Sequence, residues 1–232
     1  MSNSSIGTRK ESSLHRSLKF QYSGAGGATE ASAGIYVCDA CTEKGEFIEV
    51  QTGSFGPLKE KAKILTKKGR LRIIYPIISQ KKIELYDAGG RLLHRRKSPL
   101  KGNAWDLFKA LVHAQEIPLL KNLVIELPFT DVVEKRIDDG TGSWRRKGVR
   151  ISDRFLGSRH NSIILKSRKD YYIFIPFSKN EKFTVRDLGE KAGIKPVLAG
   201  KTLYVLKKMG LVEQVGKKGR AYLYQRRRRI GP

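Results

Sequence analysis

The chain has 232 residues, 39% of them hydrophobic, which is enough for one large or two small domains with a buried core. Its 47 Lys and Arg outnumber 22 Asp and Glu, so the net charge is +25. This excess argues against an enzyme of small neutral substrates. It favours a polyanionic partner, of which nucleic acid is the commonest.

An anionic membrane surface is the competing partner. However, the sequence has no run of 18 or more apolar residues and no charged-then-apolar signal segment at its start. We therefore expect no membrane association. The expected location is the cytoplasm, with the protein held at the nucleoid by its charge.

Residues 1–8 are rich in Ser, Asn and Gly and are expected to be disordered. A helix is predicted over residues 9–22, with Leu14 and Leu18 on its apolar stripe. Glu11 falls on the same stripe. A carboxylate on a buried face needs a partner or a metal ion, whereas a Glu in the first turn can simply interact with the helix dipole. Both interpretations stay open.

The segment 34–65 predicts two strands joined by a short polar turn, followed by a helix. The strands are expected over residues 34–40 and 46–52, and the helix from about Pro57. Residues 29–33 can add a poor edge strand before them.

Two of the carboxylates in this segment, those of Asp39 and Glu49, are candidates for a shared site. Side chains alternate between the faces of a strand, so Asp39 lies on one face of the first strand, and Glu49 shares a face of the second with Gln51. If the strands pair, the carboxylates converge and can hold a hard divalent cation, which prefers oxygen ligands. The next helix carries Lys59 and Lys63 one turn apart, which can offer positive charge to a phosphate. This combination suggests phosphodiester chemistry.

Cys38 and Cys41 are spaced as a CxxC, which is typical of zinc sites or of thioredoxin-like redox sites. Zinc needs two further ligands, and the spacing supplies none. A redox CxxC opens a helix, whereas Cys38 falls in a predicted strand. We therefore expect two reduced thiols. The histidines are scattered, and each is expected to be structural or solvated: His15, His94, His113 and His160.

Residues 70–127 predict further strands and one helix. Strands are expected over 70–78, 82–86 and 123–127, a turn over 87–90, an extended segment over 91–96, and a helix over 103–114. The sequence leaves open whether these strands extend the preceding sheet or form an insertion. Arg95, Arg96 and Lys97 form a basic cluster after the turn.

The loop over residues 138–147 ends in Trp144, Arg145, Arg146 and Lys147. An aromatic ring beside three cations can stack on a base or lie along a phosphate backbone. It can equally anchor a solvated loop. The overall charge favours the nucleic-acid role.

From residue 150 the pattern changes towards helices, which are expected over residues 153–156 and 171–177, although the second is also a plausible strand. Thr184 begins a capping box for a further helix, which stops at Gly193. Another helix follows from Pro196 to about residue 209. Two alternating segments around residues 216–219 then predict a β-hairpin.

This C-terminal order of helix, tight turn, helix and hairpin resembles the winged helix-turn-helix family over residues 183–225. In that family the second helix enters the major groove and the wing contacts phosphates or the minor groove. The positive net charge of this region also favours DNA binding, because residues 182–232 carry 14 Lys or Arg and only 3 Asp or Glu. The resemblance implies these DNA contacts: Lys195, Lys201, Thr202, Lys217, Lys218 and Arg220.

Residues 9–76 resemble the PD-(D/E)XK, or restriction-endonuclease-like, nuclease superfamily. Glu on a first helix, Asp on a strand, Glu-x-Gln on the next strand and a basic helix carry this resemblance. It implies that Asp39 and Glu49 bind Mg²⁺ or Mn²⁺, with the Val50 carbonyl as a further ligand and Glu11 as the helix acid. The metal would activate a water and neutralise charge on the scissile phosphate.

Two departures from this pattern matter. No Pro precedes Asp39, and Gln51 occupies the position that usually holds Lys. An amide can orient a water but cannot supply positive charge to a transition state. Lys59 or Lys63 can compensate from the helix; alternatively the site is inactive and the domain only holds DNA.

We therefore expect an α/β fold in which a mixed sheet flanked by helices precedes a small winged-helix domain. The expected parts are a nuclease-like domain over 9–150, a helical linker and winged helix over 151–225, and a basic tail over 226–232. The expected function is a metal-dependent DNA endonuclease acting on double-stranded or branched DNA, with a homodimer compatible with the resemblance. The alternatives are a non-catalytic DNA-binding protein or regulator, and an RNA-binding or RNA-processing protein.

Overall fold

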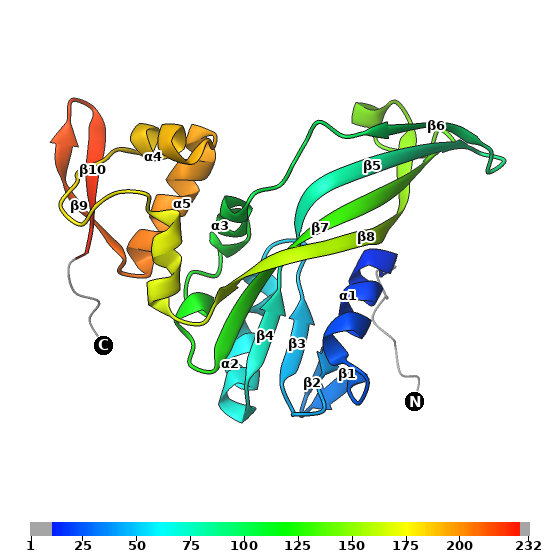
Figure 1. Cartoon of the computed structure of the whole chain (residues 1–232), viewed down its shortest axis with the longest axis horizontal. Helices are drawn as coiled ribbons and strands as arrows, with labels where there is room; N and C mark the ends of the chain where they lie inside the picture. Colours follow the sequence, from blue (N-terminus) through cyan, green and yellow to red (C-terminus); the bar gives the residue numbers. More distant parts are fainter. Residues whose placement is uncertain (1–10, 228–232) are drawn as a thin grey trace, which may run out of the picture.

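The computed structural model describes residues 11–227, which form an α/β structure with a large mixed sheet, flanking helices and a separate small antiparallel sheet (Figure 1). The predicted α/β class with a mixed sheet flanked by helices is therefore confirmed. The predictions for the N-terminus, for the start of the first helix at Arg9 and for the tail beyond Arg227 lie outside the described residues.

The large sheet contains eight strands: β1 (Ala28–Ala33), β2 (Tyr36–Cys41), β3 (Phe47–Val50), β4 (Leu71–Ile74), β5 (Ile77–Asp87), β6 (Leu92–Lys97), β7 (Leu123–Asp138) and β8 (Val149–Leu165). The small sheet consists of β9 (Val212–Lys218) and β10 (Ala221–Arg226). The α-helices are α1 (Ser13–Ser23), α2 (Lys59–Lys68), α3 (Leu107–Leu111), α4 (Val185–Ala192) and α5 (Pro196–Lys208). Short 3₁₀ turns are η1 (Gly56–Leu58), η2 (Ala104–Asp106), η3 (Ile117–Leu119), η4 (Trp144–Arg146) and η5 (Arg168–Phe174).

The central strand of the large sheet is β7. The strand order is β1-β2-β3-β4-β7-β5-β6, and β8 pairs with β7 on its other side. The first three strands run antiparallel, whereas β3, β4 and β7 are parallel neighbours. One edge of β7 pairs first with β4 and then with β5, which are separated at Pro76, a residue without a backbone donor.

The upper part of the sheet extends beyond β1–β4 (Figure 1). It consists of residues 77–97 and 129–159, in which β5, β6, β7 and β8 pair. We call this extension the arm. The arm settles the organisation of this region, because its strands extend the first sheet instead of forming a separate insertion.

Helices cover both faces of the lower sheet. On one face, Leu14 and Leu18 of α1 pack in a cluster with Ile48, Val50 and Ile74. On the other face, α2 and α3 cover a larger cluster that includes buried residues of β4 and β7. Successive residues of β4 therefore supply opposite layers, as the alternation of side chains along a strand requires.

The larger core continues without a break into the C-terminal unit, residues 168–227. Phe174 of η5 makes edge-to-face contacts with Trp105 and Phe108, at ring-centroid distances of 5.6 and 4.9 Å. Phe177 stacks on Phe183 at 4.0 Å. The Phe174 contacts join the C-terminal unit to the region around α3, whereas the Phe177–Phe183 stack lies within the unit.

Several local predictions are confirmed. The edge strand is β1, the capping box at Thr184 begins α4, and Gly193 ends it in the left-handed conformation at φ 63°. Pro196 is the first residue of α5, and the predicted hairpin is β9–β10. Among residues 11–227, no helix is both long and apolar enough to cross a bilayer.

The helix predicted over residues 153–156 is wrong, because these residues lie in the middle of β8. This strand is polar and largely exposed, so its sequence shows no apolar period; its length comes from backbone pairing with β7. The predicted domain boundary at residue 150 therefore moves, since residues 151–165 belong to the sheet. Residues 171–177, predicted as helix or strand, contain the end of η5.

The aromatic junction yields a stability prediction. Phe174 is 1% exposed and touches three other rings, so Phe174→Ala leaves a cavity at the contact between both parts of the chain. We expect a loss of about 3–5 kcal/mol in the free energy of unfolding, measured by urea denaturation. Phe20→Ala, at a side chain that is 74% exposed, is the control and should change it by less than about 0.5 kcal/mol. Equal effects of the two substitutions would contradict this junction.

Candidate active site

The candidate site lies where the pairing between β2 and β3 stops. The two strands pair only at Ala40 with Ile48 and at Cys41 with Phe47. Beyond these pairs, side chains replace the backbone ladder. The Asp39 N–H donates to Glu49 Oε1 at 3.2 Å, and the Val50 N–H donates to Asp39 Oδ2 at 2.8 Å. The two carboxylates thus converge, as the strand pattern predicts, and each also holds the opposite strand.

An imidazole occupies the space between Asp39 and the Val50 carbonyl. His15 Nε2 lies 3.0 Å from Val50 O and 3.3 Å from Asp39 Oδ2, while Nδ1 lies 2.5 Å from Glu11 Oε1. Burial lowers the pKa of His15, but the contacts with Asp39, Glu11 and Val50 O outweigh it and raise the pKa to about 9. An imidazolium cation therefore lies against these oxygens at neutral pH.

A lysine of α2 pairs with the second carboxylate. Lys61 Nζ lies 2.5 Å from Glu49 Oε1, and the Glu49 side chain is only 4% exposed. Burial and the neighbouring charge of Asp39 raise the pKa of Glu49, and Lys61 opposes this shift. Lys61 thus keeps a buried carboxylate compensated.

The lysines expected at this site, Lys59 and Lys63, do not contact the two carboxylates. Lys59 pairs with Glu116 at 2.7 Å and Lys63 pairs with Glu60 at 2.8 Å. Both flank Lys61 by two residues, and two residues correspond to more than half a helical turn. They therefore point away from the side of α2 that faces Glu49.

Glu11 has partners, so the dipole interpretation of this residue is unnecessary. It precedes Ser12, the N-cap of α1, and its Oε1 lies 3.3 Å from Lys19 Nζ as well as beside His15. These hydrogen bonds and charges outweigh burial and lower the pKa of Glu11. Gln51 follows β3 directly and is half-buried, and its N–H donates to Ile74 O at 2.8 Å.

The site therefore holds three carboxylates and three cations: Glu11, Asp39 and Glu49 with His15, Lys19 and Lys61. Oxygen donors from Asp39, Glu49 and Val50 suit Mg²⁺ or Mn²⁺ in chemical type. The His15 ring lies among them, so a metal there requires this ring to move. Within residues 11–227, no cluster of three or more His, Cys, Asp or Glu side chains has the geometry of a metal site as the side chains now lie.

Sequence reasoning missed His15, Lys19 and Lys61. The sequence did contain a signal for His15 and Lys19. Glu11, His15 and Lys19 follow one another at intervals of four residues, which places them on one helix face. Lys61 had none, because its approach to Glu49 depends on how α2 is rotated against the sheet. The two cysteines are free, and Cys38 is buried.

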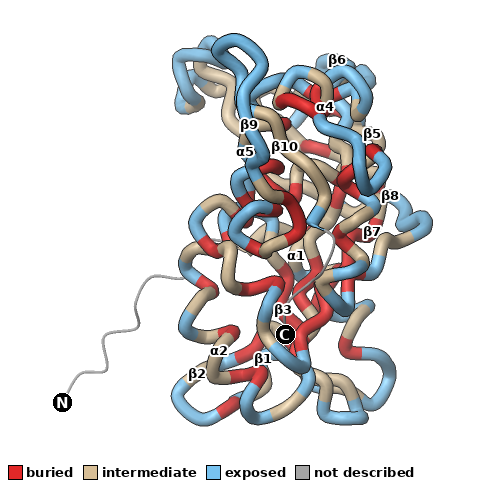
Figure 2. The backbone as a smooth tube through the Cα atoms, turned by 90° about the vertical axis from the view of Figure 1, so that its left-hand side faces the viewer, coloured by how far each residue is buried: buried red, intermediate tan, exposed pale blue. Residues whose placement is uncertain are grey.

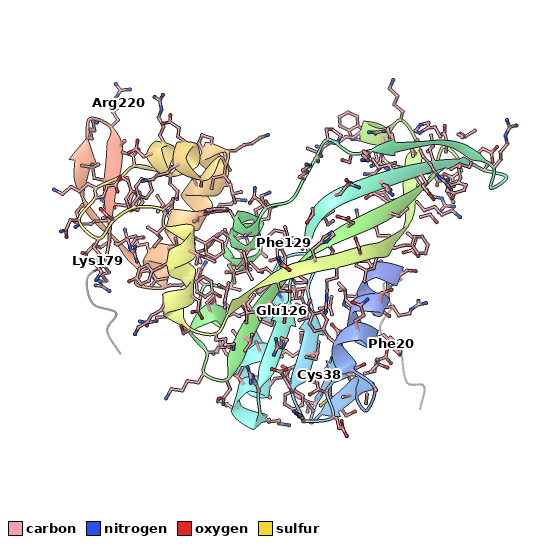
Figure 3. The ribbon with its side chains drawn as sticks, in the orientation of Figure 1. Phe20, Cys38, Glu126, Phe129, Lys179 and Arg220 are labelled. Carbon is pink, nitrogen blue, oxygen red and sulfur yellow. The ribbon has the colours of Figure 1, made fainter. Side chains whose placement is uncertain are left out.

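The predicted nucleic-acid contacts form two exposed basic surfaces. The first belongs to the C-terminal unit: Lys195, Lys201, Lys217, Lys218 and Arg220, the last of which projects from the hairpin tip (Figure 3). Thr202 does not join it, because it is fully buried and its hydroxyl donates to Leu198 O at 2.9 Å. This prediction is wrong, since Thr202 lies on the packed face of α5.

The second surface lies on the arm: Arg95, Arg96, Lys97, Trp144, Arg145, Arg146 and Lys147. All seven side chains are exposed. Figure 2 shows the β9 hairpin and the β6 region as exposed tube, whereas buried segments concentrate in the middle of the molecule. The chain thus brings Asp39 and Glu49 together and presents most of the other predicted residues on the surface.

The position of His15 predicts its titration. Because the pKa in the folded protein is raised from 6.5 to about 9, the imidazolium stabilises the fold fully below about pH 6.5, and this contribution is lost as the pH rises through about 9. Asp39→Asn removes the strongest raising contact and should lower the His15 midpoint, measured by NMR of the ring Cε1–Hε1 group. A wild-type His15 midpoint near 6.5 would contradict the geometry.

Comparison with known proteins adds a family. Residues 12–166 match the family model described as a domain of unknown function, DUF8091. A protein of Treponema pallidum (strain Nichols), described as an uncharacterized protein, is 26% identical over 221 residues, covering 95% of this chain and 87% of that protein. No solved structure matches the chain. The matched residues run from the N-cap of α1 to just beyond β8, and so include the whole large sheet and every residue of the candidate site except Glu11. The chain belongs to the DUF8091 family.

Proposed function

We propose that the protein is a divalent-metal-dependent endonuclease that hydrolyses phosphodiester bonds of DNA and is delivered to DNA by its C-terminal unit. One observation carries this proposal. The carboxylates of Asp39 and Glu49 converge at the break between β2 and β3, the Val50 carbonyl shares the His15 ring nitrogen with Asp39, and Lys61 lies 2.5 Å from Glu49. These groups lie in a chain of net charge +25.

The order of elements around the site supports the proposal. One helix, three antiparallel strands, a second helix and a strand parallel to the third follow one another, and sheet neighbours follow chain order from β1 to β4. This is what the resemblance to the restriction-endonuclease-like superfamily leads one to expect. The cation missing at Gln51 has a substitute in Lys61, which reaches Glu49 from α2.

Asp39, Glu49 and Val50 O would hold the Mg²⁺ or Mn²⁺ ion. When bound, the metal supplies an activated water and neutralises charge on the phosphate. Lys61 supplies a fixed positive charge beside Glu49 for the phosphate oxygens. Glu11 contacts Nδ1 of His15, whereas the other ring nitrogen, Nε2, lies beside the Val50 carbonyl. The contact with Glu11 can therefore hold the ring when Nε2 moves away from the oxygen atoms of Asp39 and Val50.

The C-terminal unit supplies the grip on duplex DNA. The helices α4 and α5 are joined at Gly193, and the next hairpin ends in the exposed Lys217 and Lys218. Lys201 on α5 and Lys195 at its N-cap are both exposed, and α5 is the helix that the winged-helix resemblance assigns to the major groove. Their charges favour phosphate contacts.

A second candidate function is non-catalytic DNA binding, in which a degenerate nuclease-like domain serves a regulator. The observation that favours it is that groups of the chain itself contact both carboxylates. Asp39 contacts His15 and the Val50 N–H, and Glu49 contacts Lys61 and the Asp39 N–H. Carboxylates satisfied in this way stabilise the two strands without a metal.

Cleavage assays separate the two candidates. We expect cutting of supercoiled plasmid with Mg²⁺ or Mn²⁺ but not with chelator, and a fall of about 100-fold or more in Glu49→Gln and Asp39→Asn, because each removes a charged metal ligand. Glu43→Gln, at an exposed turn residue, is the matched control and should cut normally. Thermal melting of each variant checks that the β2–β3 contacts survive.

Lys61→Met sharpens this assay, because Lys61 pairs with the Glu49 carboxylate and the hydrogen bonds that join β2 to β3 are made by other groups. This substitution should lower cleavage while Mn²⁺ binding, followed by calorimetry, persists. Intact wild-type protein that binds DNA but cuts neither plasmid, linear duplex, single-stranded nor branched DNA would favour the non-catalytic candidate.

Duplex binding has its own prediction. The double substitution Lys195→Ala with Lys201→Ala should weaken binding to a blunt duplex and reduce the slope of log affinity against log salt by about 1 for each phosphate that is no longer neutralised. Lys44→Ala with Lys67→Ala removes the same charge from exposed positions in the turn after β2 and on α2, and is the control. Fluorescence anisotropy across a salt series measures both. Equal weakening in the two variants would show that α5 does not bind the phosphates.

A further inference from the structure

A basic hollow lies on the arm, where β6 meets the loop between β7 and β8. It has a volume of about 310 Å³. Its lining comes from four strands and one loop: Ile83, Leu85, His94, Arg96, Arg136, Arg145, Arg146, Lys147 and Val149. In Figure 1, β6 and the β7–β8 connection lie together at the end of the arm.

The lining combines positive charge with an apolar floor. It includes four arginines and a lysine, and none of its residues is acidic. Ile83, Leu85 and Val149 supply the apolar part. Arg136 donates to Glu134, but this fully buried carboxylate also pairs with Lys81 and Arg154, so positive charge remains in excess. Cations over an apolar floor suit a phosphate joined to a sugar or base better than a free inorganic anion.

The backbone of the loop that supplies Arg145, Arg146 and Lys147 is held by local hydrogen bonds and close packing. The Gly142 N–H donates to Gly148 O at 2.6 Å, and a Cβ at residue 142 would meet the Val149 backbone at 2.1 Å, so only glycine fits. Asp139 pairs with Arg150 across the base of the loop. Lys147 is held in the left-handed conformation at φ 51°. The backbone positions that carry the cations are therefore fixed, which reduces the entropy cost of ordering the loop on binding.

An unusually exposed aromatic ring adjoins the hollow. Trp144 is 82% exposed, and the Arg145 guanidinium lies 5.5 Å from its ring centroid. Its neighbour Arg145 lines the hollow, so a ligand there lies next to an open aromatic face. Such rings stack on unpaired bases irrespective of sequence. Within a duplex the bases already stack on one another and would not reach this ring.

We propose that the basic hollow holds one nucleotide of an unpaired DNA strand, with Trp144 stacking on an adjacent base. This rests on the proposed function, and it names the substrate class: duplex DNA that continues into a single strand, as in tailed or branched molecules. The C-terminal unit grips the duplex, and the arm captures the unpaired strand.

The distance between the hollow and the candidate site is compatible with an arm that binds the unpaired strand while the C-terminal unit binds the duplex. Ser13, at the start of α1, donates through its N–H and its hydroxyl to Asp153 of β8. Glu11 and His15 belong to the same end of this helix. From Asp153 to Val149 of the hollow, β8 runs four residues, or about 13 Å at the usual rise of a strand. A strand held in the hollow therefore passes within a few nucleotides of the end of α1 that carries the site.

Binding assays without divalent metal test the inference apart from cleavage. The probes are a blunt hairpin duplex and the same hairpin with a single-stranded thymidine tail, followed by fluorescence anisotropy. The wild type should bind the tailed hairpin about tenfold more tightly than the blunt one. Trp144→Ala, and the double substitution Arg145→Ala with Arg146→Ala, should remove this difference and leave blunt-duplex affinity nearly unchanged. Trp144→Phe should keep most of it.

The variant Lys44→Ala with Lys67→Ala again controls for charge and should keep the tail preference. The tail should also quench Trp144 emission, with Trp144→Phe as the blank for the half-buried Trp105. No tail preference in a wild type that binds blunt duplex would overturn the inference and leave the proposed grip intact. A decrease in the arm variants equal to that in the control would also overturn it. Tail binding that depends on Trp144, without blunt-duplex binding, would support the hollow and refute the duplex grip.

Discussion

The arrangement of the candidate site depends on two carboxylates that act as backbone acceptors. Where β2 and β3 separate, Glu49 accepts the Asp39 N–H and Asp39 accepts the Val50 N–H, so neither buried donor is left unsatisfied. The strands can therefore diverge without losing these hydrogen bonds. The groups that hold the two strands together are the same groups that we propose as metal ligands, so their structural role and their proposed chemical role are tied together.

Buried carboxylates must be compensated, and the flanking helices do this. His15 and Lys19 of α1 and Lys61 of α2 meet Glu11, Asp39 and Glu49 from both layers around the sheet. A pair broken in such surroundings leaves an uncompensated charge, which is strongly destabilising. The same cations matter for the proposed chemistry: His15 lies among the oxygen donors that would hold a metal ion, and Lys61 lies beside Glu49 as a second positive charge. The proposed catalytic function and the non-catalytic alternative differ in whether a metal displaces the first of them.

The long strand β7 connects the parts of the molecule. Its first residues pair with β4 beside the candidate site, its middle and end carry the arm, and Glu126 near its start bonds Arg72 and Tyr22 from different layers (Figure 3). The C-terminal unit joins this frame through the aromatic contacts of Phe174. The molecule thus carries two basic surfaces with different support: exposed lysines on the C-terminal unit, which shares the larger core, and a hollow beside Trp144 on the paired strands of the arm.

The sequence by itself determined the features encoded within a few residues: the capping box at Thr184, the glycine turn at Gly193, the β9–β10 hairpin and the strand pattern that brings Asp39 to Glu49. Only the tertiary structure decided the features that depend on distant partners. The polar strand β8 exists because β7 pairs with it, Lys61 reaches Glu49 because of how α2 is rotated on the sheet, and Thr202 is buried because that face of α5 packs inward. Local patterns record periodicity and turn chemistry, whereas the rotation of a helix and the length of a paired strand are set by contacts between residues far apart in the chain.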